Sequence, residues 1–274
     1  MAPMPMPAGR FPGFPHVLAA LLALAVVAGY LLAARRLRRR GDVWPPVRDG
    51  SFAAGGVGLA AVAMTPPPGG GFTGHMVQHL VIGMAAPLLM VLGRPVTLAL
   101  RALPAGRVRR GLPAAARSRP AGWLLFPPTA AVIDAGGLWL LYRTRLFADT
   151  HDSPWLSAAV HVHVLAAGLL FSFAVCGLDP ARHRRGMPLR AAAGAAHAVL
   201  AKSLYAVPPP GTGLTAHDVA RGAEVMYYGG DVIEIALAAV LAWQWYTATG
   251  RRLARSLDVH RPAASAQQPG ERPA

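Results

Sequence analysis

Residues 17–34 read VLAALLALAVVAGYLLAA and contain no Asp, Glu, Lys or Arg. An α-helix of about 20 apolar residues crosses the hydrocarbon core of a bilayer. A second stretch, residues 155–177, also lacks these charged residues. The whole chain of 274 residues is 54% hydrophobic and 14% charged, whereas a soluble domain of this length would show shorter elements, each with one polar face. The sequence therefore predicts an all-α, polytopic bundle of transmembrane helices.

The apolar segments are separated by breaks rich in Arg, Pro and Gly, and they predict seven membrane spans. The second span is the weakest, because its 14 residues are rich in Gly and Ala, and a re-entrant or interfacial segment is the alternative. Pro87 in the third span and Pro127 in the fourth are expected to kink their helices, since proline lacks the N–H that closes a helical turn. The seven spans are expected near residues 17–34, 51–64, 75–98, 122–142, 155–177, 190–206 and 223–246.

The net charge of +15 comes mostly from arginines in the short segments between these spans. With seven spans, the two alternating sets of segments carry 21 and 4 arginines, and the positive-inside rule places the richer set in the cytoplasm. The N-terminus is then outside and the C-terminus inside. No basic stripe carries interleaved aromatic residues, so the charge does not indicate nucleic-acid binding. The predicted organisation is an extracytoplasmic segment 1–16, a seven-helix membrane domain 17–247 and a disordered basic cytoplasmic tail 248–274.

The segment HMVQH at residues 75–79 places two histidines at positions i and i+4, on one helical face and about 6 Å apart. Metal ligands use this spacing, although interfacial histidines bonded to carbonyl groups share it. His161 in the fifth span lies about 10 Å along its helix from the outer end, close to the depth of the first pair. His163 points about 200° away from His161, so only one of them is expected to join a site with His75 and His79. Seven of the ten histidines are predicted in the outer half: His16, His75, His79, His151, His161, His163 and His217.

Copper is the metal that this set of side chains favours. Imidazole and thioether groups both bind copper(I), so Met76 and Met226 are candidates for further ligands beside the histidines. Buried methionines also serve as core packing, which is the alternative. The single cysteine, Cys176, excludes a disulfide within the chain and a CxxC metal motif.

Ionisable residues inside a membrane bundle are candidates either for function or for structural ion pairs. In one interpretation Lys202 pairs with a carboxylate of the seventh span, and in the other the carboxylates relay protons. The residues concerned are Asp134, Lys202, Asp231 and Glu234.

A longer motif begins at the first histidine pair. Residues 75–97 start with HMVQHL and end with LGRPVT, and this run resembles the signature of the CtaG-type cytochrome c oxidase assembly factors. His161, which precedes the sequence GLLF at 168–171, is similar to the histidine of that family's second histidine-bearing helix. Residues 218–227 match a third family segment only in part. Asp218, Gly222 and Met226 fit that segment, whereas Val219, Ala220 and Tyr227 do not.

The resemblance implies a plasma-membrane protein with seven spans that helps to mature a haem–copper oxidase. It implies that copper is handled on the outer side, and His75, His79 and His161 match family positions. The resulting hypothesis is a non-enzymatic metallochaperone that holds copper on these three histidines. Its partners are then the lipid bilayer and the cytochrome c oxidase subunits that receive the metal.

Other functions are compatible with the same residues. A helical scaffold would bind oxidase subunits without metal, and its small residues would allow close helix packing. A haem-bearing membrane oxidoreductase would use His79 and His161 as axial ligands on facing helices. A transporter would use Asp134 and Glu234.

Overall fold

The computed structural model describes residues 13–66, 69–104, 106–116, 118–178 and 208–259, together with Val199 and Ser203. Throughout this part the chain forms helices and connecting turns, without a strand. The predicted all-α class is therefore confirmed. Within the described ranges, four helical stretches are long and apolar enough to cross a membrane: α1 (Phe14–Arg39), Gly71–Leu92, α10 (Pro154–Cys176) and the Ala216–Gly250 part of α12 (Ala216–Val259).

Two shorter helices occupy the positions of further predicted spans. They are α2 (Pro46–Met64) and α8 (Pro127–Arg143). α2 is one continuous helix that packs between α1 and α4. The sixth predicted span, 190–206, lies almost entirely outside the described residues. The count of seven spans and the N-out orientation stay predictions.

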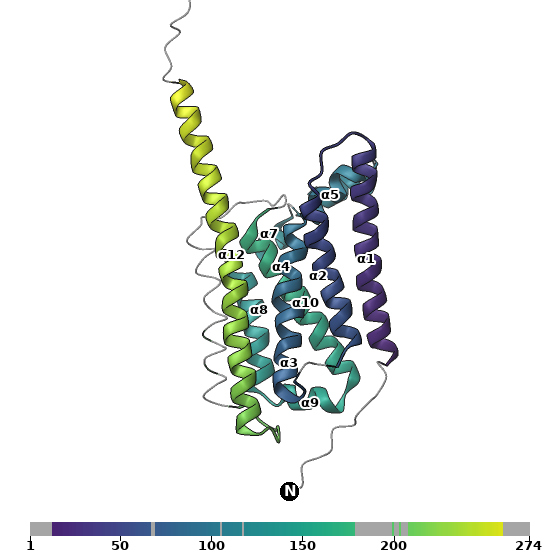
Figure 1. The fold of residues 1–274 in the computed structure, drawn as a ribbon, viewed down its shortest axis with the longest axis vertical. Coiled ribbons are helices and arrows are strands. Elements are labelled where there is room, and N and C mark those ends of the chain that lie inside the picture. The colour runs from purple at the N-terminus through teal and green to yellow at the C-terminus, as the bar shows by residue number, and fades with distance from the viewer. Residues whose placement is uncertain are drawn as a thin grey trace, which may run out of the picture.

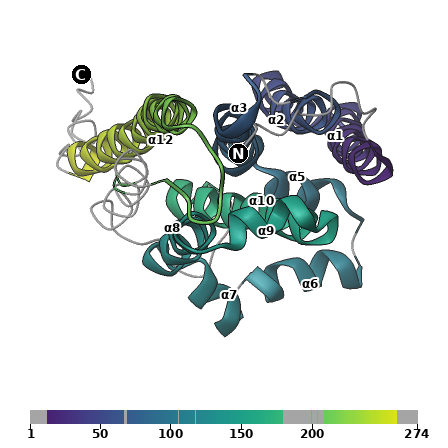
Figure 2. The ribbon, with the colours of Figure 1, turned by 90° about the horizontal axis from the view of Figure 1, so that it is seen from below.

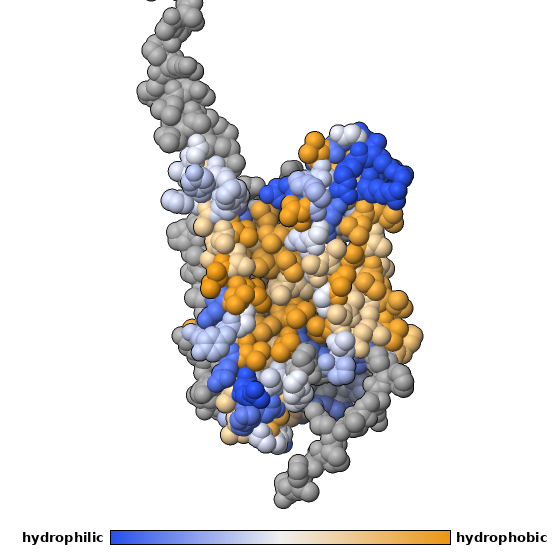
Figure 3. Space-filling model, viewed as in Figure 1, coloured by the Kyte–Doolittle hydropathy of each residue, from blue (hydrophilic) through white to orange (hydrophobic). Residues whose placement is uncertain are grey.

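The long helices lie side by side, with the stretch Gly71–Leu92 at the centre (Figures 1 and 2). This stretch consists of α3 (Gly71–His79), the π-helix η1 (Leu80–Ala85) and α4 (Ala86–Leu92). It contacts α2, α10 and α12. A belt of hydrophobic residues crosses the middle of the molecule, between hydrophilic groups at its two ends (Figure 3). This distribution is the one that a bilayer requires of a bundle of spans.

The two ends of the bundle differ in chemistry. At the lower end in Figure 1, α3 and α12 begin and the short helix α9 (Leu146–Asp152) lies across the end; we call this the histidine end. At the upper end, α1 finishes in an arginine-rich turn beside α5 (Pro95–Ala102); we call this the arginine end. The separation of arginine-rich from histidine-rich segments thus follows the pattern that charge counting predicts.

The two prolines predicted to kink their helices stand in different local structures. Pro87 cannot donate to the carbonyl of Gly83, and the helix accommodates it by widening into the π-helix η1 just before it. The Gly83 carbonyl faces Gly168 of α10, where any Cβ would overlap with it. Pro127 kinks nothing, because it stands in the first turn of α8, a position at which proline fits a helix. The predicted fourth span therefore begins at residue 127, after the separate short helix α7 (Arg119–Leu124).

The tail behaves differently from its prediction up to Val259. The sequence assigns residues 248–274 to a disordered segment, but α12 continues as a helix to Val259. The run from Arg251 to Val259 contains no proline or glycine, so nothing in it interrupts the helix. The remainder of that segment lies outside the described residues.

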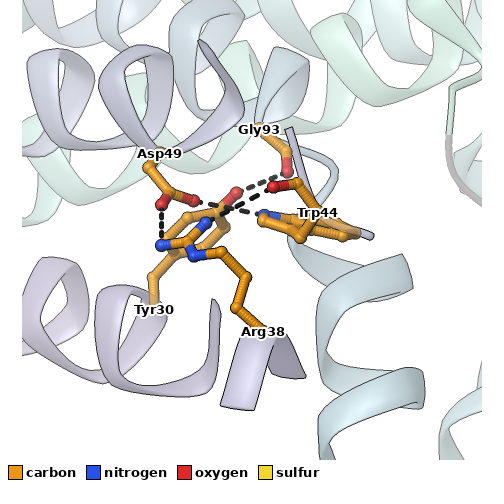
Figure 4. Close-up of polar contacts among 5 residues, drawn as sticks. All are labelled: Tyr30, Arg38, Trp44, Asp49 and Gly93. Carbon is orange, nitrogen blue, oxygen red and sulfur yellow. Dashed lines mark hydrogen bonds and ion pairs between the residues drawn. The ribbon is translucent and has the colours of Figure 1, made fainter. Parts of the chain in front are cut away.

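A polar cluster fixes the connection between α1 and α2 (Figure 4). The Arg38 guanidinium binds the Asp49 carboxylate at 2.6 Å, and the Trp44 indole N–H donates to the other oxygen of Asp49 at 3.2 Å. More than two helical turns before Arg38 on α1, the Tyr30 hydroxyl donates to the Gly93 carbonyl at 2.8 Å. These bonds join α1, α2 and the end of α4 at the arginine end.

Candidate functional site

The first histidine helix, α3, is held at its N-terminus by a carboxylate from α12. Asp218 accepts the backbone N–H of Phe72 at 2.7 Å, the N–H of Thr73 at 3.0 Å and the Thr73 hydroxyl at 2.7 Å. These backbone groups belong to the first turn of α3, which has no partner within its own helix. Gly71 adopts a positive φ of 49°, and a Cβ there would overlap with the Asp218 carboxylate. A side chain 146 residues away in sequence thus positions the helix that carries His75 and His79.

His75 lies one turn further along α3, among aromatic side chains. Its Nε2 is 3.0 Å from the hydroxyl of Tyr142 at the end of α8. Its ring centroid is 4.7 Å from that of Phe147 in α9, in an edge-to-face arrangement. His151 and His161 are both close enough to His75 for an electrostatic interaction. Helices α3, α8, α9 and α10 therefore bring these side chains together at the histidine end.

His79 follows on the same face of the helix and is 5% exposed. Its ring lies edge-to-face with Tyr142, with the centroids 6.4 Å apart. A Cβ built on Gly83 would stand 3.1 Å from Cε1 of His79 and 2.9 Å from a methyl carbon of Val164. The imidazole of His79 therefore lies in the interface between the central helix and α10. The predicted sharing of one face by His75 and His79 is confirmed, and Tyr142 contacts both rings.

Two histidines have their ring orientation set by backbone carbonyls. Nδ1 of His161 is 2.7 Å from the Ser157 carbonyl oxygen, and Nδ1 of His151 is 3.1 Å from the Phe147 carbonyl oxygen. A carbonyl oxygen only accepts, so each Nδ1 is the atom that donates its proton. In the neutral imidazole the lone pair is then on Nε2. This arrangement is the one in which metal-binding histidines are commonly held.

The secondary candidates are one exposed histidine and two buried methionines. His163 is exposed, and its Nε2 lies against Gly137 of α8. Met76 and Met226 are fully buried and belong to the same hydrophobic cluster as Tyr142 and Phe147. Within the described ranges, no three His, Cys, Asp or Glu side chains are close enough to share one metal ion. The histidines form a neighbourhood of potential ligands rather than a closed coordination sphere.

The intramembrane acids occupy another part of the bundle. Asp134 and Glu234 line one cavity between α8, α10 and α12, together with Ser172. Asp231 is close enough to Glu234 for an electrostatic interaction. Lys202 lies outside the described residues. The choice between an ion pair and a proton relay stays open.

Several residues of the site are not predicted from the sequence. Tyr142 and Phe147 look like ordinary membrane aromatics, and no local pattern connects them with His75. His151 was placed in the outer half by the topology, but nothing in its spacing assigned it to the site. Asp218 offers the clearest signal. It is an acid in the first turn of α12, and glycines precede α3; both are features typical of helix N-termini.

Residues 28–248 match the model of the cytochrome c oxidase caa3 assembly factor family. The chain belongs to this family. The match extends from within α1 to the end of the membrane part of α12, and it includes His75, His79, His161 and Asp218. The resemblance seen in residues 75–97 is thereby confirmed.

Curated relatives of this caa3 assembly factor family member come from mycobacteria. Uncharacterized proteins of Mycobacterium bovis and Mycobacterium tuberculosis are each 35% identical over 193 residues, which cover 66% of this chain and 28% of their own length. An uncharacterized protein of Mycobacterium leprae is 32% identical over 200 residues, which cover 70% of this chain and 29% of its own length. The chain thus spans less than a third of these relatives. No solved structure matches it.

Proposed function

We propose that this member of the caa3 assembly factor family binds copper at the histidine end and passes it to a subunit of cytochrome c oxidase. The observation that carries the proposal is a group of imidazoles at the histidine end. His75 and His151 both pack against the ring of Phe147, and His151 and His161 both have Nδ1 bonded to a backbone carbonyl, which leaves the Nε2 lone pair for a ligand. Copper is the cargo of the site, and no catalytic step is assigned to the chain. The family supplies the oxidase as the recipient.

The chemistry of these side chains suits a metal that must be released again. Imidazole nitrogen is a good ligand for copper. His161 is held for binding through Nε2, and His75 would exchange its contact with the Tyr142 hydroxyl for the metal. His79 lies one turn deeper on the same helical face. No three of the described side chains share one ion as they stand, so His75, His79 and His161 would have to move closer together to hold copper with three nitrogens. An open coordination position then remains for a ligand from the oxidase subunit, and delivery requires such an exchange.

Copper(I) binding by the purified full chain tests the proposal. The metal is titrated in competition with a chromogenic copper(I) chelator for the wild type, His75→Ala and His161→Ala. We expect each substitution to weaken binding by at least tenfold, since it removes a nitrogen ligand. His163→Ala is the matched control on α10, because its side chain faces α8, and it should bind like the wild type. Undetectable copper uptake by the wild type, or equal losses in all three variants, would contradict the proposal.

Two further measurements separate the alternatives. A scaffold would co-purify with oxidase subunits equally well in the wild type and in a His75→Ala/His161→Ala double variant, without any difference in oxidase copper content. A copper chaperone would keep that association but leave the oxidase short of copper. An absorption spectrum with a Soret band in the purified chain would instead support a haem-binding protein.

A further inference from the structure

The arginine end carries more positive charge than its own carboxylates neutralise. Arg38 pairs with Asp49 at 2.6 Å and Arg101 pairs with Asp42 at 2.8 Å. Figure 3 shows the resulting hydrophilic cap above the apolar belt, over the end of α1. The remaining exposed arginines of this end have no carboxylate partner among the residues that the structure describes: Arg35, Arg36, Arg39, Arg40, Arg107, Arg109, Arg110 and Arg119.

Helix α6 (Arg107–Ala116) adds an apolar surface to this charge. Val108, Leu112 and Ala115 have the spacing i, i+4 and i+7 and share one face. Arg110 lies on the opposite face, and Arg107 and Arg109 lie at the two edges of the apolar face. None of the residues of α6 is buried, and Val108 is 67% exposed. The helix connects α5 to α7, both of which lie toward the arginine end (Figure 1). On its apolar face Val108 and Ala115 are exposed, and Leu112 is half-buried.

We propose that the arginine end binds the phosphate headgroups of anionic phospholipids and that α6 lies in the membrane interface. A basic helix with one apolar face is stable there, because the apolar side chains enter the acyl region while the arginines reach the phosphates. The guanidinium group binds phosphate through two parallel hydrogen bonds. An anionic headgroup is favoured over a zwitterionic one, since its charge is not cancelled by an attached ammonium group. An acidic lipid supplies both an anionic phosphate for the arginines and acyl chains for the apolar face of α6.

The neighbouring loop is rigid and presents apolar groups at the same end. Trp44 is 3% exposed, and the Arg48 guanidinium lies 4.6 Å over its ring. Figure 4 shows how Asp49 holds Trp44 and Arg38 together. Val43, which precedes Trp44, is 83% exposed. In the adjacent helix α7, Trp123 is 75% exposed, and aromatic residues of this kind gather where spans meet the headgroups.

Native mass spectrometry of the full chain in neutral detergent tests this proposal. Phosphatidylglycerol and phosphatidylcholine are added separately, and lipid-bound protein is counted for the wild type and for Arg107→Gln/Arg110→Gln. We expect the wild type to prefer phosphatidylglycerol, and the double variant to bind it about tenfold more weakly, because each arginine near an anionic surface contributes up to about fivefold. The matched control is Arg145→Gln/Arg221→Gln, which removes the same charge from the histidine end and should leave binding within twofold of the wild type.

A second variant, together with the unfolding temperature, distinguishes loss of lipid binding from loss of folding. Arg107→Lys/Arg110→Lys preserves the charge and should retain most of the lipid binding, and both double variants should unfold at the wild-type temperature because α6 is not buried. Equal binding of the two lipids by the wild type would overturn the proposal. So would an equal loss in the variants of the two ends. Displacement of the lipid by millimolar inorganic phosphate would show that the site is one for free phosphate instead.

Discussion

Replacing Asp218 by alanine should loosen the helix that carries the first two histidines without unfolding the bundle. The Asp218 carboxylate accepts three hydrogen bonds from Phe72 and Thr73, at 2.7, 3.0 and 2.7 Å. Two of the donors are backbone N–H groups in the first turn of α3, which have no other partner inside the helix. After substitution these N–H groups can form hydrogen bonds only with water. Local opening of the first turn should therefore become more frequent.

The size of the effect follows from the kind of bond that is lost. A side-chain cap at a helix N-terminus contributes about 1 kcal/mol, and a hydrogen bond to a charged group contributes about 1.5 to 3 kcal/mol. Asp218 is half-buried, so water partly replaces it and screens its charge. We expect a loss of about 2 kcal/mol, which corresponds to a rise of about 30-fold in the opening equilibrium. Asp218→Asn keeps one carbonyl oxygen as acceptor and should lose about half of that free energy.

Hydrogen–deuterium exchange of the full chain in detergent measures this directly. Peptides that cover residues 71–79 should exchange about 30-fold faster in Asp218→Ala, whereas peptides from α10 should be unaffected. Glu224→Ala is the control, because Glu224 is an exposed carboxylate on the same helix. If exchange of residues 71–79 is the same in the two variants, Asp218 does not hold α3. Weaker copper binding together with faster exchange would show that the position of α3 matters for the histidines.

Two further substitutions test the packing around the site. Tyr142→Phe removes the hydroxyl next to His75 Nε2 and should lower the free energy of unfolding by about 1 kcal/mol. Thermal unfolding in detergent measures this change. An unchanged stability would mean that the 3.0 Å contact contributes nothing. Gly168→Val should cost about 3 kcal/mol or more, because its side chain would overlap with the Gly83 carbonyl. Gly136→Val is its control on α8, where the nearest atom to an added Cβ is 4.0 Å away, and equal losses at both positions would contradict the close-packing argument.

Prediction from sequence worked best where the property is local. The apolar run 17–34 lies within α1, and the run 155–177 nearly coincides with α10, because hydrophobicity along the chain decides which segments enter a membrane. Proline was harder to interpret, since the same residue kinks a helix in its interior and begins one at its N-terminus. Pro127 does the latter, and Pro87 is absorbed by a π-helix. Neither outcome can be predicted from the residues next to the proline.

In the candidate site, too, local relations are predictable from the sequence and tertiary contacts are not. The pairing of His75 with His79 follows from a helical repeat of 3.6 residues and needs no tertiary contact. Its relation to Tyr142, His151 and Asp218 could not be predicted, because these residues are 67 or more positions away from His75 and reach it only through helix packing.

The sequence by itself determined that the chain forms apolar helices, which ends of those helices carry arginine or histidine, and to which family it belongs. The tertiary structure decided which side chains meet at the histidine end, whereas the rings of His151 and His161 are oriented by carbonyls four residues earlier in their own helices. Periodicity and hydrophobicity act between neighbours in the chain, whereas the contacts of Asp218 with α3 depend on how separate helices dock. Docking is governed by the shapes of whole helix surfaces, and a short motif does not contain that information.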